Sequence, residues 1–177
     1  MLLRNYYKAV SFCMGGNAAT DINLVNYSGG NTKPTTYVDG VKYLTPTKNV
    51  DSFYASLSRM STTTGDSYPG IIIGTGNTPP TLDDYWLDGD MITSFASSVV
   101  TTFESDDNSS AVTALCTITN SGSKAFTIRE VGLYGKPRGS VSSEPVLVER
   151  TVLDVPLTIE PGSVGQLTYT IKLNYPA

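Results

Sequence analysis

The side chains that most often carry catalysis are scarce in this sequence. It contains no histidine and only two cysteines, Cys13 and Cys116. The lack of histidine excludes Ser-His-Asp and Cys-His triads and every histidine-based zinc site. The cysteines match no metal-binding or redox spacing, so we expect two reduced thiols packed as small apolar side chains, with a bridge between them as the alternative.

Carboxylates are the remaining candidates for chemistry. Four of them fall within a short segment: Asp83, Asp84, Asp88 and Asp90. Calcium needs several oxygen ligands, but this spacing does not match an EF-hand loop. We expect instead acids at the start of a helical turn over 82–87, which Thr78 or Thr81 would cap, followed by a tight turn at 88–90.

Two pairs of carboxylates could be imagined in the arrangement that glycosidases use: Glu130 with Glu149, and Asp154 with Glu160. Sequence alone sets no distance between them, and any acidic chain contains such pairs. The segment 74–79 begins like a dinucleotide-binding loop, but Pro79 stands where the third glycine belongs, so we predict a turn that ends a strand. The sequence therefore predicts no catalytic residue, no metal and no cofactor, and the protein is not expected to be an enzyme.

The elements that would position these side chains are strands. Ile71 to Ile73 is a β-branched run between glycines, typical of a buried strand. A long strand over 91–104 is expected to turn at 105–108 and pair with 111–120, where apolar residues alternate with threonine. Further strands are expected over 126–134, 146–153, 157–159 and 167–173, with Pro156 at a break or edge and turns at 120–123 and 160–162.

One irregularity is predicted inside a strand. Phe126 and Ile128 share one parity, whereas Val131 and Leu133 share the other, so a bulge or bend is expected at residues 129–130. Residues 136–140 are expected to begin an exposed loop that runs to Pro145.

The first part of the chain gives weaker signals. Residues 2–14 show helical spacing of apolar side chains and end at two glycines, which predicts a short amphipathic helix. Residues 36–44 read as a hairpin around Asp39-Gly40. We therefore expect residues 1–67 to form a helix or arm with irregular β structure, and residues 68–177 to form an antiparallel β-sandwich of jelly-roll or Ig-like type.

Composition excludes several kinds of partner. Of 177 residues, 40% are hydrophobic and 16% charged, and the net charge is −4. Twelve scattered Lys and Arg argue against nucleic acid as a partner. No apolar run approaches the roughly 18 residues of a membrane span, and residues 1–8 do not resemble a secretory signal, so we expect a chain made in a cytoplasm, with no membrane partner. Eleven tyrosines favour β structure and protein–protein contacts.

Three stretches resemble small virion structural proteins of tailed bacteriophages. They are residues 71–87 (IIIGTG, then PPTLDDYWL), residues 118–134 (ITNSG, then FTIREVGLY) and residues 147–162 (LVERTVL, then VPLTIEPG). The resemblance covers roughly residues 70 to 173. It implies a subunit of the head, neck, tail or fibre attachment, present in many copies in the virion, whose partners are other virion proteins and copies of itself. It implies no catalytic residue.

Two sets of side chains are the predicted contacts with neighbouring subunits. The first is the apolar stripe of the N-terminal helix: Leu3, Tyr6, Tyr7 and Val10. Such a stripe has to be covered, either by a neighbour or by the chain's own body. The second set is the loop that starts at Pro137 and Arg138.

The rival function is a carbohydrate-binding module in which Trp86 and Tyr85 stack on sugar rings, whereas a buried Trp86 that caps the core is the structural alternative.

Overall fold

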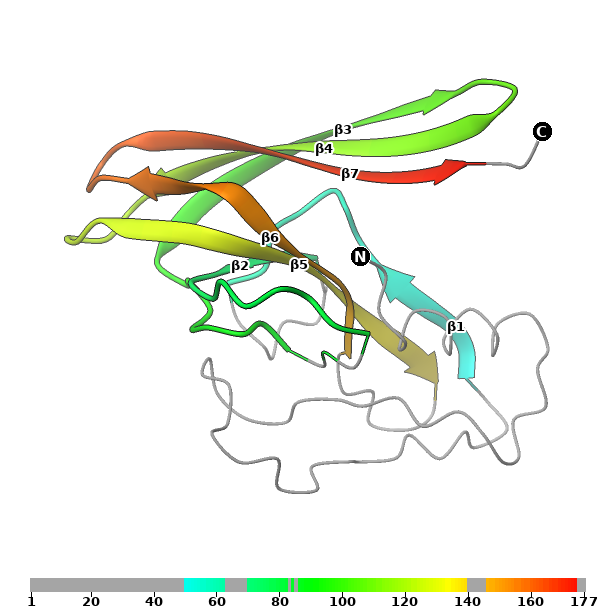
Figure 1. Ribbon diagram of the computed structural model, residues 1–177, viewed down its shortest axis with the longest axis horizontal. Coiled ribbons are helices and arrows are strands. Elements are labelled where there is room, and N and C mark those ends of the chain that lie inside the picture. Colours follow the sequence, from blue (N-terminus) through cyan, green and yellow to red (C-terminus); the bar gives the residue numbers. More distant parts are fainter. Residues whose placement is uncertain (1–49, 63–69, 83, 85, 140–145, 175–177) are drawn as a thin grey trace.

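A computed structural model describes residues 50–62, 70–82, 84, 86–139 and 146–174. Within those residues the protein is all β and contains no helix. The seven strands, coloured along the chain in Figure 1, are β1 (Val50–Ala55), β2 (Ile71–Gly74), β3 (Phe95–Ser105), β4 (Ser109–Asn120), β5 (Phe126–Gly139), β6 (Val146–Ile159) and β7 (Val164–Asn174). The prediction of a mainly β protein is confirmed, whereas the predicted helix over 2–14 and hairpin over 36–44 lie outside the described residues.

The strands form two antiparallel sheets. In sheet A, β5 pairs with β6 on one side and with β2 and β1 on the other. In sheet B the order is β3-β4-β7. Sheet B lies over sheet A in Figure 1, and the β3–β4 hairpin reaches beyond it.

One apolar core joins the two sheets. Sheet A contributes Ile71, Ile73, Ile128, Val131, Leu133 and Val148, and sheet B contributes Phe95, Ala114, Cys116, Ile118, Leu167 and Tyr169. The predicted alternation in β4 is confirmed, because Ala114, Cys116 and Ile118 have no exposed surface. Cys116 is a free thiol, and burial raises its pKa to about 11.

The predicted loop over 136–145 is wrong in its first part. Residues up to Gly139 continue β5, where Pro137 lies opposite Phe53 and Arg138 opposite Ser52 of β1. The partner strand is more than 80 positions away in the sequence, so local turn residues could not indicate it. The ladder with β6 ends at Gly135, so Pro137 lies where β5 is paired on one side, as sheets require of proline.

Two other strand boundaries also differ from prediction. The strand expected from residue 91 begins at Phe95, and Met91 makes only an isolated bridge to Gly74. The two strands expected over 146–153 and 157–159 are one strand, β6, which runs through Pro156. Because β6 is the edge of sheet A, proline can stand there without loss of a ladder hydrogen bond.

The predicted turns and bulge are confirmed. The β5–β6 register shifts between Ile128 and Glu130, which moves the following side chains to the opposite face. Asp106 accepts hydrogen bonds from the backbone N–H groups of Asn108 and Ser109 and closes the β3–β4 turn. In the turn before β7, Gly162 has φ of 71° and the Ser163 N–H donates to the Glu160 carbonyl.

A buried ion-pair network as the candidate functional site

The outer face of sheet A, opposite sheet B, is covered by the chain between β2 and β3. This segment, residues 75–94 apart from 83 and 85, is the green trace beneath β5 and β6 in Figure 1. Its side chains Trp86, Leu87 and Met91 pack against Ile72, Tyr134 and Leu147 of the sheet and form a second apolar cluster. Its ends are held together because the Ile92 N–H donates to the Ile73 carbonyl and the Thr75 N–H to the Asp90 carbonyl.

Glu130 is the centre of the site. The bulge in β5 turns its side chain to the outer face, where none of its surface is exposed. Its Oε1 accepts hydrogen bonds from the backbone N–H groups of Gly76 and Gly89, both at 2.8 Å. Its Oε2 accepts from the Asp88 N–H at 2.9 Å and from Arg150 Nε at 2.7 Å. One carboxylate thus holds both ends of the covering segment.

Arg150 completes the network from β6. It is 1% exposed, and besides Glu130 it donates to Asp84 Oδ2 at 2.7 Å and to the Thr78 carbonyl at 2.9 Å. Burial disfavours the charged guanidinium, but hydrogen bonds and charges of Glu130 and Asp84 outweigh it, so the pKa of Arg150 lies above its ordinary value. A planar guanidinium presents several donors at once, which lets one side chain join β5, β6 and the covering segment.

Two glycines allow the backbone to approach Glu130 closely. A Cβ on Gly76 would lie 2.4 Å from the Gly89 nitrogen and 2.5 Å from Glu130 Oε1. A Cβ on Gly89 would lie 2.3 Å from the Gly76 nitrogen. Backbone atoms cannot move aside as a flexible side chain can, so both positions require glycine. The turn predicted for residues 74–79 is therefore confirmed, and its Gly76 lets the backbone N–H reach the carboxylate of Glu130.

This arrangement fits a structural role and not acid–base chemistry. Glu130 already accepts four hydrogen bonds and has no solvent-exposed surface from which it could reach a substrate. Glu149 lies on the inner face of sheet A, opposite Leu133 of the core, so the sheet separates the two carboxylates of the first imagined pair. Asp154 and Glu160, the second pair, are both exposed.

The acidic cluster before β3 is used in hydrogen bonds within the chain. Asp84 accepts from Thr81 and from Arg150, and Asp88 accepts from the hydroxyl of Thr78. No three acidic or cysteine side chains in the described part of the chain are grouped so that they could hold a metal ion. Residues 82, 84, 86 and 87 are not helical, so the helical turn predicted over 82–87 is not found among the residues described there. Thr81 nevertheless begins a hydrogen-bonded turn, because the Asp84 N–H donates to the Thr81 carbonyl at 3.2 Å and the Asp84 carboxylate accepts from the Thr81 N–H.

Trp86 is a core residue. It is 1% exposed and packs edge-on against Tyr134, with ring centroids 5.6 Å apart. A sugar-stacking residue needs one ring face open to solvent, which Trp86 does not have. The alternative that Trp86 caps a core is confirmed, while Tyr85 lies outside the described residues.

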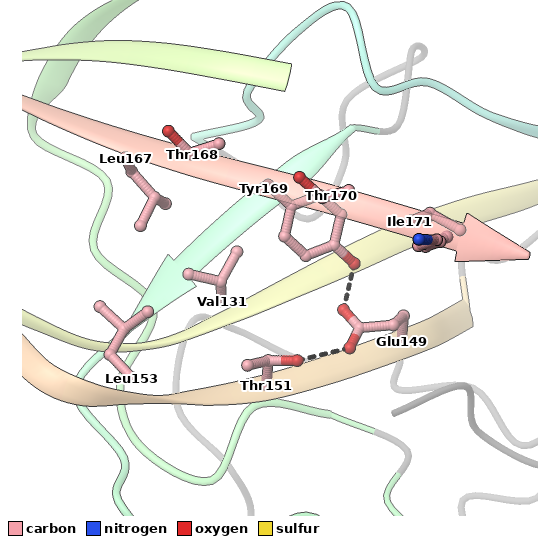
Figure 2. A pocket seen from close by; sticks show the side chains of 10 residues that line it. Val131, Glu149, Thr151, Leu153, Leu167, Thr168, Tyr169, Thr170 and Ile171 are labelled. Carbon is pink, nitrogen blue, oxygen red and sulfur yellow. Dashed lines mark hydrogen bonds between the residues drawn. The ribbon is translucent and has the colours of Figure 1, made fainter. Parts of the chain in front are cut away.

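A second polar group lines a cavity between β6 and β7. The cavity, about 350 Å³, is bounded by Val131, by alternate residues of β6 from Glu149 to Leu153, and by residues 167–172 of β7. Figure 2 shows Leu167 and Tyr169 pointing from β7 toward β6, and Thr168 and Thr170 pointing away. The Tyr169 hydroxyl donates to Glu149 Oε2, and Thr151 donates to Oε1 at 2.7 Å. Burial, together with the adjacent negative charge of Glu149, raises the pKa of Tyr169.

The Tyr169→Phe variant is expected to be less stable than the wild type by about 1.5–3 kcal/mol, because it removes a hydrogen bond to a buried carboxylate. Urea unfolding followed by circular dichroism measures this difference. Thr170→Val is the matched control, since it removes an exposed hydroxyl hydrogen bond to Thr113 and should change stability by less than about 0.5 kcal/mol. Equal effects of the two substitutions would contradict the assignment.

The residues predicted to contact neighbouring subunits are only partly placed. Leu3, Tyr6, Tyr7 and Val10 lie outside the described residues. Pro137 and Arg138 lie in β5 beside β1 and not in a loop, which corrects their predicted setting but leaves their contacts as a prediction.

Comparison with known proteins gives no family for this chain. No protein-family model matches it, and neither a curated protein nor a solved structure matches it significantly. Among the residues that the structure describes, no helix is long and apolar enough to cross a membrane.

Proposed function

We propose that this protein is a non-enzymatic structural subunit of a tailed-bacteriophage virion, made in the host cytoplasm and assembled into the particle through protein–protein contacts. Its place would be in the head, neck, tail or fibre attachment. We further propose that its two sheets form a β-sandwich of jelly-roll or Ig-like type.

The observation that carries this proposal is where the residues of the resemblance lie. Gly76 and Asp84 belong to the first stretch, Glu130 to the second and Arg150 to the third, and these four residues meet in the buried network. Side chains that are buried and fully hydrogen-bonded fix a shape. The polar residues of the three stretches thus stabilise the fold. A rigid fold suits a structural subunit that acts through contacts with its neighbours.

Exposed apolar side chains support the same proposal. Val100, Phe103 and Leu173 of sheet B are 63%, 68% and 47% exposed, and Val164 is 60% exposed. Val100 and Val164 lie on the outer face of sheet B, whereas Phe103 and Leu173 lie on its inner face, in successive rows of that face. Neighbouring exposed apolar side chains on one face are typical of protein–protein contact sites.

Analysis of purified particles tests the proposed function. The chain should co-purify with particles of the phage or prophage that encodes it through a density gradient, at a constant copy number relative to the major capsid protein, as measured by quantitative mass spectrometry. A chain that stays entirely in the soluble fraction of the lysate, or varies in copy number between preparations, would contradict the proposal. The carbohydrate-binding rival predicts retention on a glycan array, but the buried Trp86 gives it no support.

A further inference from the structure

The two edges of sheet B differ from the free edge of sheet A. Among the described strands, β3 and β7 each pair with β4 alone. Proteins usually protect free strand edges with proline, charged residues or bulges. Edge strand β6 follows that rule, with Pro156, Asp154 and a shifted register. Strands β3 and β7 contain no proline and one charged residue each, Glu104 in β3 and Lys172 in β7.

The two unprotected edges are complementary to each other. Both strands are antiparallel to β4, so β3 and β7 run parallel. Residues in register across β3, β4 and β7 form rows. One row is apolar (Phe103, Val112 and Ile171) and the next consists of threonines (Thr102, Thr113 and Thr170). A third row carries opposite charges at its two ends (Glu104, Ala111 and Lys172). If a second copy continued the sheet in the same register, its Glu104 would lie beside Lys172, its Thr102 beside Thr170 and its Phe103 beside Ile171.

The cavity beside β7 offers a place for the exposed phenylalanine. Phe103 has the same parity as Phe95 and Val99, so it projects from the inner face of sheet B, yet it is 68% exposed. The cavity lies on that same side of β7, below the edge where a further strand would pair, and its walls include Val131, Leu153 and Ile171. An incoming β3 in register would direct its Phe103 toward this cavity.

We propose that copies of this chain associate head-to-tail, with the β7 edge of one copy pairing in parallel with the β3 edge of the next. Phe103 enters the β6–β7 cavity, and Glu104 of one copy pairs with Lys172 of the other. This inference builds on the proposed structural role and names the partner as a second copy of this chain. A head-to-tail contact between unlike edges generates a ring when the rotation closes and a filament when it does not.

Two-fold pairing of like edges fits these features less well. Pairing β7 with β7 would leave Phe103 exposed in both copies, and pairing β3 with β3 would leave both cavities empty. Neither arrangement places Glu104 of one copy beside Lys172 of another in the register of the existing rows. Only the head-to-tail contact both fills the cavity with Phe103 and pairs these two charges.

Sedimentation velocity over a concentration series of the full chain tests the contact. The wild type should form species larger than a dimer, and Phe103→Ser should weaken self-association at least about tenfold, because it removes a large apolar side chain from the contact. Val155→Ser is the matched control, since Val155 is 80% exposed on the protected edge β6 and the substitution should leave association unchanged.

Charge reversal distinguishes the head-to-tail contact from two-fold pairing. Glu104→Lys and Lys172→Glu should each weaken association about three- to fivefold, since each places like charges side by side. The double variant Glu104→Lys/Lys172→Glu should recover wild-type association. A double variant no stronger than either single variant overturns the pairing.

A disulfide cross-link tests the register directly. In the variant Cys13→Ser/Thr102→Cys/Thr170→Cys, the new cysteines of one copy are separated by β4, about 9.5 Å apart, which is too far for a bridge. Between head-to-tail copies they would be adjacent, so oxidation should give a ladder of covalent multimers, whereas Cys116 is buried and should not take part. Thr102→Cys/Thr113→Cys in the same background should give a bridge within one chain and no ladder.

The outcomes separate this contact from the proposed function. The head-to-tail contact would be overturned if the wild type stays monomeric and the cysteine variant gives no ladder, both in solution and in purified particles. Incorporation of the chain into particles would still support the proposed structural role in that case. A ladder formed by a chain that never enters particles would sustain the contact and contradict the virion role.

Discussion

Replacement of Arg150 by methionine is expected to lower the free energy of unfolding by about 3–5 kcal/mol, because it leaves the buried charge of Glu130 without its cationic partner. The same change removes the bonds to Asp84 and to the Thr78 carbonyl, so the covering segment loses these two attachments to β6. Urea unfolding followed by circular dichroism measures the loss. A decrease below about 1 kcal/mol would contradict the central role of the network.

Arg129→Met is the matched control for this substitution. Arg129 neighbours Glu130 in β5, but its side chain is exposed, so the same chemical change should cost less than about 0.5 kcal/mol. Each single variant leaves one charge of the Arg150–Glu130 pair buried without its partner. The double variant Arg150→Met/Glu130→Gln removes both charges of the pair, so it should cost less than the sum of the two single variants. Strict additivity would mean that the two side chains do not interact.

Replacement of Trp86 by alanine is expected to cost about 3–5 kcal/mol, because it opens a cavity in the second core cluster between Tyr134 and the neighbouring aliphatic side chains. Thermal or urea unfolding should be followed by circular dichroism, since Trp86 is the only tryptophan and its fluorescence is lost in the variant. Leu82→Ala, at a side chain that is 48% exposed in the same covering segment, should cost much less. Equal losses at the two positions would show that the segment does not pack as described.

Much of the strand pattern could be predicted because it depends on neighbours in sequence. The threonine alternation of β4 and the triple isoleucine of β2 follow from side-chain periodicity alone. The bulge at residues 129–130 also followed from a change of parity within a single strand. The extension of β5 past Gly135 did not, since it depends on β1, which no local pattern connects to it.

The candidate site could be predicted only in part. The sequence suggests Glu130 only as half of an imagined carboxylate pair, and it separately predicts the bulge at residues 129–130 that turns this side chain to the outer face. Nothing in the spacing of Asp84, Glu130 and Arg150 indicates that they meet, because three separate elements bring them together. Arg150 was the available signal: it is the one cation of the strand β6, and a charged side chain is buried in a core only when it is paired.

Amide hydrogen exchange at Gly76, Asp88 and Gly89 tests most directly the claim that the polar residues of this chain hold its shape. All three N–H groups lie in a loop between strands and donate to the buried carboxylate of Glu130. They are predicted to exchange as slowly as the amides of the central strand β5, and to lose that protection in the Arg150→Met variant. Exchange of all three at the rate of an open loop in the wild type would contradict the account.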